Sequence, residues 1–238
     1  MYGMYGYGYG YGFDPTIILV LIGVALSLWA QGRVNSTFSR YSRVRSMTGM
    51  TGAEAARRLL NAQGIYDVTV QPIAGELTDH YDPRTKTVNL SQSVYGATSV
   101  AAIGVAAHEC GHAMQDNEGY APLRFRSALV PAANFGSKLS WPLILLGLVF
   151  GGLGSPLVEI GILMFSLAVL LTLPVEYNAS ARAVRLLDSQ GILAGEEVSG
   201  TRKVLNAAAL TYVAAAATSI LQLLRLIILF GGRNRRDN

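Results

Sequence analysis

Four long apolar stretches constrain this chain more than any other feature. They cover residues 16–30, 139–150, 157–173 and 207–230. Only 14% of the 238 residues are charged, against about 25% in soluble domains. A helix of about 20 apolar residues crosses a bilayer. The sequence therefore predicts a mainly α-helical membrane protein, in which a small α+β domain is joined to three or four apolar membrane helices.

The polar sequence between these stretches divides the chain into segments. We expect a low-complexity Tyr/Gly tail over 1–14, a first membrane helix over 15–30, the first part of the α+β domain over 31–138, a transmembrane helical hairpin over 139–174, the second part of the domain over 175–206, and an apolar helix with a basic C-terminus over 207–238. The tail has the composition of a disordered segment, and a contact with a partner or a second copy is the alternative.

Local signals place the elements of the first domain part. Thr51 and Glu54 have capping-box spacing and predict a helix that ends near Gly64. Residues 68–71 and 86–90 are typical of strands, with a turn around His80 between them. A helix over 100–115 follows, whose first half has small residues on nearly every face.

Basic residues indicate orientation rather than nucleic-acid binding. The net charge is +4, but no nucleic-acid motif accompanies it. Residues 1–30 contain no Lys or Arg, whereas 31–138 contain eleven and 176–204 contain four. The positive-inside rule then predicts a multi-pass protein of the cell membrane, with an external N-terminus and both domain parts in the cytoplasm. Three arginines after residue 230 favour a last helix that lies on the membrane, although the sequence leaves a crossing open.

The motif His108-Glu109-Cys110-Gly111-His112 carries the chemistry. Histidines four apart lie on one helix face and can bind one metal ion, and the intervening glutamate is the general base in zinc proteases of this pattern. Cys110 faces away from the histidines, so we expect it to lie in the core. As the sole cysteine, it excludes an intrachain disulfide. A closed structural zinc site usually needs four ligands.

A catalytic zinc site needs a third protein ligand, and Glu176 is the best candidate. It directly follows the hairpin. We expect it to begin a helix at the same depth as the helix that carries the motif. Tyr177, Asn178 and Ser180 beside it suit supporting hydrogen bonds. Glu118 is too close to His112 in sequence, and Glu196 and Glu197 suit the first turn of the next helix. We expect one metal ion per chain, and we infer Zn²⁺ because the predicted ligands are two histidines and a carboxylate.

His80 is the candidate donor to the oxyanion of a tetrahedral intermediate. The alternative is a turn histidine that bonds Asp79 or Asp82. Tyr81, Arg182 and Tyr212 are competing oxyanion donors.

Longer stretches of the sequence carry a family resemblance. Residues 77–83 (LTDHYDP), 105–112 (VAAHECGH), 173–180 (LPVEYNAS) and 203–213 (KVLNAAALTYV) resemble the bacterial membrane neutral zinc metallopeptidases, the YugP-like family. The resemblance implies a multi-pass membrane protein with a gluzincin-type, zincin-like site, in which His108, His112 and Glu176 are ligands and Glu109 is the base. The chain is distantly similar to the CAAX prenyl protease and heat-shock membrane protease group, which has an aspartate where this chain has Ser180.

The sequence thus predicts a membrane-embedded zinc-dependent endopeptidase. We expect its partners to be the lipid bilayer and peptide or membrane-protein substrates. A non-catalytic assembly protein with structural zinc is the alternative and would hold zinc without turnover. A transporter needs polar or charged residues inside the membrane helices, and Glu159 is the single charged residue of the hairpin.

Overall fold

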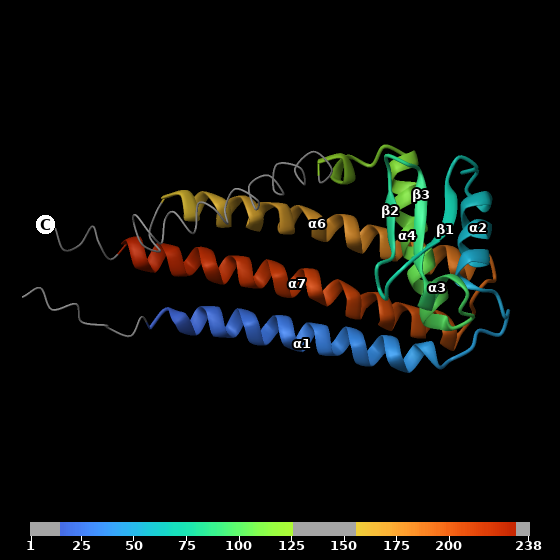
Figure 1. The fold of residues 1–238 in the computed structure, drawn as a ribbon, viewed down its shortest axis with the longest axis horizontal. Coiled ribbons are helices and arrows are strands. Elements are labelled where there is room, and N and C mark those ends of the chain that lie inside the picture. The colour runs from blue at the N-terminus through green and yellow to red at the C-terminus, as the bar shows by residue number, and fades with distance from the viewer. Residues whose placement is uncertain (1–14, 126–155, 232–238) are drawn as a thin grey trace, which may run out of the picture.

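The computed structural model describes residues 15–125 and 156–231, which form a bundle of three long helices with a small domain at one end (Figure 1). The long helices are α1 (Ile17–Ser42), α6 (Pro156–Ser189) and α7 (Glu196–Gly231). α7 lies between α1 and α6 and packs against both (Figure 1). The predicted helix over 139–150 and the hairpin turn lie outside the described residues.

The small domain combines a three-stranded sheet with short helices. Its elements are α2 (Gly52–Ala62), β1 (Thr69–Ile73), β2 (His80–Asp82), β3 (Thr87–Ser91), α3 (Gln92–Tyr95) and α4 (Val100–Asn117). β3 is the central strand, with β1 parallel on one side and β2 antiparallel on the other. The described part of the chain is therefore mostly helical with one small sheet, as predicted.

The local predictions for this domain hold with one correction. Both hydrogen bonds of the capping box form, since Thr51 accepts from the Glu54 backbone and Glu54 accepts from that of Thr51. The prediction that His80 lies in a turn is wrong, because His80 begins strand β2. The turn comes later, at residues 83–86, where the Asp82 carboxylate accepts from the Arg84 backbone N–H.

Helix α4 is the centre of the core and packs against α2, α6 and α7. Its small residues permit these close contacts. An ideal Cβ at Gly111 would lie 2.6 Å from the backbone oxygen of Ala179 on α6, so the two backbones touch at this crossing. Cys110 is fully buried, with its Sγ 3.6 Å from the Ala56 carbonyl oxygen on α2. The predicted core position of Cys110 is confirmed.

Two helices in the described ranges, α1 and α7, are long and apolar enough to cross a membrane. The predicted total of three or four apolar membrane helices is not shown. α1 has exposed apolar side chains, including Leu28 and Trp29. The two helices are antiparallel: Thr218 of α7 donates to the Gly23 carbonyl of α1, and Arg225 donates to Thr16.

Two helices extend further than predicted. α1 continues beyond Ala30 to Ser42, so the first polar residues after the apolar stretch belong to the same helix. α6 runs without a break from Pro156 to Ser189 and contains Pro174. Glu176 therefore lies inside a helix, and the expectation that it begins one is wrong. A proline removes one backbone donor, and here the helix continues past it.

Candidate metal centre

Three side chains meet where α4 crosses α6. His108 and His112 are one turn apart on α4, and Glu176 projects from α6. The Nε2 of His108 lies 3.2 Å from the Nε2 of His112 and 3.2 Å from Oε2 of Glu176. The third side, between His112 Nε2 and Glu176 Oε2, measures 3.6 Å. The three predicted ligands therefore form a compact triangle.

This triangle fits a tetrahedral zinc ion. Zinc lies about 2.0–2.1 Å from histidine nitrogen and carboxylate oxygen. At these bond lengths, two ligand atoms of a regular tetrahedron are about 3.3–3.4 Å apart. The sides of 3.2, 3.2 and 3.6 Å bracket that value. Three protein ligands leave the fourth position of the tetrahedron for water or substrate, as in catalytic zinc sites.

A glutamine fixes the tautomer of His112. The Oε1 atom of Gln115 lies 3.0 Å from Nδ1 of His112. The amide nitrogen of the same side chain donates to the Val175 carbonyl at 2.9 Å and to Asn178 Oδ1 at 3.0 Å. Its oxygen must therefore face the imidazole as an acceptor, and His112 donates from Nδ1. The lone pair of His112 is then on Nε2, which faces the other two ligands.

Asn178 connects this glutamine to the surface. Asn178 Oδ1 also accepts from Nε of Arg182 at 2.7 Å, and Arg182 forms a 2.6 Å ion pair with Glu118. Gln115 is fully buried, so water cannot reach its amide. Its hydrogen-bond partners must come from the protein itself, and Asn178 is one of them. Glu118 is occupied by Arg182, consistent with its exclusion as a metal ligand.

The hydroxyl of Ser180 orients His108. Ser180 Oγ lies 3.1 Å from Nδ1 of His108. The contact that the sequence suggested for this serine is therefore present. With Nδ1 bonded to Ser180, the Nε2 of His108 faces Glu176.

Electrostatics favour a charged carboxylate at the site. Burial alone favours the neutral acid of Glu176, but the imidazoles of His108 and His112 beside its carboxylate outweigh it and hold the Glu176 pKa well below its ordinary value. Burial likewise opposes the charged form of His112, yet its contact with Glu176 and the nearby Glu109 charge raise the His112 pKa. The three side chains thus attract a positive charge placed among them.

Glu109 is a buried carboxylate beside the two histidines. It is 7% exposed, and no hydrogen bond or ion pair to it occurs within residues 15–125 and 156–231. Its charge acts on His112, so it lies close to the triangle without belonging to it. A carboxylate in this position is available to a water molecule at the site.

The candidate oxyanion donors are placed differently. His80 is exposed and uses both ring nitrogens, with Nδ1 2.9 Å from the Thr78 carbonyl and Nε2 3.2 Å from Asn89 Nδ2. These partners differ from Asp79 and Asp82, the ones expected of a turn histidine. Tyr81 donates to Asp116, and Tyr212 is half-buried on α7. The role of His80 as an oxyanion donor stays a prediction.

Comparison with known proteins shows to which family the chain belongs. A family model described as "Putative neutral zinc metallopeptidase" matches residues 16–231. The chain belongs to this neutral zinc metallopeptidase family. The chain is also 48% identical over 224 residues to the "Putative membrane protease YugP" of Bacillus subtilis strain 168, covering 93% of this chain and 98% of the relative. No solved structure shows a significant match to it.

One important residue of the candidate metal centre was not predicted from the sequence. Gln115 was not singled out, although it lies three residues after His112 on the same face of α4. That spacing was the available signal. Its significance depends on Val175 and Asn178, which approach it only after α4 and α6 have packed.

Proposed function

We propose that this metallopeptidase is a membrane-embedded zinc endopeptidase. One zinc ion per chain is held by His108, His112 and Glu176, and Glu109 is the general base. The observation that carries this proposal is the triangle of ligand atoms, whose sides suit tetrahedral zinc. The buried Glu109 carboxylate beside the triangle supports a catalytic rather than structural site.

When bound, zinc supplies the Lewis acidity that makes water a nucleophile at neutral pH and polarises a peptide carbonyl. Glu109 takes a proton from the attacking water and delivers it to the leaving amine nitrogen. Ser180 and Gln115 keep the two imidazoles in the orientation that presents both Nε2 atoms. The chain thus provides proton transfer and fixed ligand geometry.

An extended peptide suits the sheet beside the site. β2 is an edge strand and contacts α4, the helix that carries both histidines. Edge strands offer unpaired backbone groups to an added strand. We propose that substrates bind as extended segments of membrane proteins or of proteins close to the bilayer.

We propose that α1 crosses the bilayer with its N-terminus outside and the metal site facing the cytoplasm. α7 packs antiparallel to α1 as far as the pair Thr16 and Arg225, so it occupies the same depth. This packing favours an α7 that also crosses, in place of the surface-lying helix predicted from sequence. Arg225 is then level with the start of α1, where a charged side chain reaches the outer surface.

A single substitution tests the reaction. Full-length protein is purified in detergent as wild type, Glu109→Gln and the exposed control Glu76→Gln. For each protein, the zinc content is measured. Cleavage is then measured on two substrates, an unfolded soluble protein and a membrane protein. We expect about one zinc per chain in all three. Cleavage by Glu109→Gln falls by about 10²–10⁴, and the control cleaves normally.

Two other outcomes contradict the proposal. Zinc in all variants with cleavage by none, on either substrate, supports the assembly protein with structural zinc. Absence of zinc from the wild type removes the metal site itself.

A further inference from the structure

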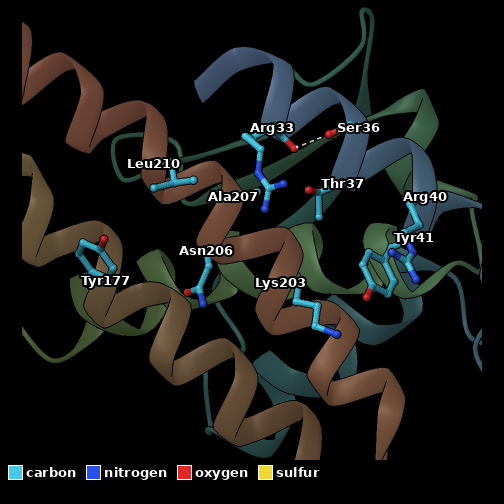
Figure 2. A pocket seen from close by; sticks show the side chains of 10 residues that line it. All are labelled: Arg33, Ser36, Thr37, Arg40, Tyr41, Tyr177, Lys203, Asn206, Ala207 and Leu210. Carbon is cyan, nitrogen blue, oxygen red and sulfur yellow. Dashed lines mark hydrogen bonds between the residues drawn. The ribbon is translucent and has the colours of Figure 1, made fainter. Parts of the chain in front are cut away.

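A groove lies between α1 and α6, with α7 as its floor (Figure 2). Its cavity is about 570 Å³. The side chains that line it come from all three helices: Arg33, Ser36, Thr37, Arg40, Tyr41, Tyr177, Lys203, Asn206, Ala207 and Leu210. We call it the α1–α7 groove, because α1 and α7 supply all of its lining residues except Tyr177. Its residues on α1 recur every three or four positions, so they form one face of that helix.

The charge of this groove is entirely positive. It contains Arg33, Arg40 and Lys203, and no Asp or Glu lines it. In the described part of the chain, none of the three cations has an ion pair with a carboxylate. In Figure 2, Arg33 reaches over α7 and Lys203 reaches towards Tyr41. Thr37 and Tyr41 add hydroxyl groups, which donate readily to phosphate oxygens, whereas the Ser36 hydroxyl donates to the Arg33 carbonyl oxygen at 3.2 Å.

The groove lies where all three helices change from apolar to polar. On α1 the exposed Trp29 is one turn before Arg33. On α6 Tyr177 follows the apolar stretch that ends at 173, and on α7 Lys203 precedes the apolar stretch that begins at 207. Tryptophan and tyrosine mark the membrane–water boundary, and lysine and arginine accumulate on its cytoplasmic side.

We propose that the α1–α7 groove binds an anionic phospholipid. Its phosphate pairs with Arg33, Arg40 and Lys203, while its acyl chains lie along the exposed apolar faces of α1 and α7. Basic pockets between membrane helices on the cytoplasmic side bind anionic headgroups in this way. The proposal rests on the membrane placement proposed above, but it requires no peptidase activity.

Lipid binding to the full-length, zinc-loaded protein in mild detergent tests the proposal. Native mass spectrometry measures affinity for phosphatidylglycerol and, as a neutral lipid, phosphatidylcholine. The test variant is Arg33→Gln/Arg40→Gln/Lys203→Gln. The matched control neutralises three exposed cations outside the groove, Arg58→Gln/Arg84→Gln/Arg124→Gln. A single reversal, Lys203→Glu, keeps the test valid if the triple variant folds poorly, and zinc content reports folding.

We expect wild type and control to prefer phosphatidylglycerol. The test variant should bind it about 100-fold more weakly, since each cation near an anionic membrane surface contributes about five-fold in affinity. Lys203→Glu should bind it at least about ten-fold more weakly by the same reasoning.

Three results would overturn the proposal. The first is equal affinity for both lipids, and the second is equal phosphatidylglycerol binding by test and control variants. The third is full displacement of the lipid by millimolar inorganic phosphate, which would make the occupant a soluble anion. All are independent of peptide cleavage, so loss of the lipid site and loss of the proposed peptidase function are distinguishable.

Discussion

At the scale of single residues, His112 is oriented by an amide instead of a carboxylate. Metal-binding histidines usually donate their second N–H to a carboxylate, a carbonyl or water. Here two carboxylates, Glu109 and Glu176, are already buried at the site. Together they balance the charge of one divalent ion. A third would leave uncompensated charge in the interior, whereas Gln115 accepts the hydrogen bond without adding any.

This arrangement predicts that Gln115→Met weakens zinc binding by about 10–100-fold, the usual effect of losing such a partner. Gln115→Glu should keep most of the affinity because it retains the acceptor. It should also lower thermal stability, since the Val175 carbonyl loses its donor. Competition titration with a zinc-binding dye measures the affinity, with the exposed Gln63→Met as control. Equal zinc affinity in Gln115→Met and wild type would refute the role of this amide.

At the scale of elements, the crossing of α4 over α6 assembles the site. Gly111 is the closest contact, because an added Cβ would meet Ala179 O at 2.6 Å and Ala179 Cα at 3.0 Å. Both atoms are backbone and cannot rotate away. Any larger residue must separate the helix with two of the predicted ligands from the helix with the third.

We therefore expect Gly111→Ala to cost about 1–3 kcal/mol of stability through overpacking and to weaken zinc binding. The melting temperature with a chelator reports the stability of the metal-free chain, and its rise without the chelator reports zinc binding, since zinc stabilises only the folded chain. Gly32→Ala on α1 is the matched control, because no atom lies within 4 Å of its added Cβ. A Gly111→Ala protein that melts and binds zinc like wild type would show that the crossing is not tight.

The sequence predicted those parts of the elements that depend on neighbours along the chain. His108 and His112 share a face by helical spacing alone, and Thr51 and Glu54 cap a helix within one turn. Strand β2 has only three residues and exists through its pairing with β3, so no local pattern revealed it. Gln115 acquires its role from residues 60 and 63 positions away. Contacts of that range form only after the helices pack.

At the scale of the whole molecule, the proposed orientation predicts a labelling pattern. The native Cys110 is fully buried, and burial raises the pKa of its thiol, so it gives little background. The variant Tyr11→Cys, on the N-terminal side of α1, should react with a membrane-impermeant maleimide in intact cells. The variant Met47→Cys, at a position that is 89% exposed, should react only after permeabilisation. Labelling of Met47→Cys in intact cells would place the metal site outside.

In the proposed membrane placement, the unbroken helix α6 connects the bilayer to the candidate metal site. At 1.5 Å per residue, its start at Pro156 is about 35 Å from the Ala179 crossing, and Glu176 is about 4.5 Å from it. If α6 tilts as a rigid rod about this crossing, a 4 Å displacement of its start moves Glu176 by only about 0.5 Å. That displacement is within the tolerance of a preorganised site. In this placement, the short distance from Glu176 to the crossing shields the predicted zinc ligand from the motion of the surrounding lipid.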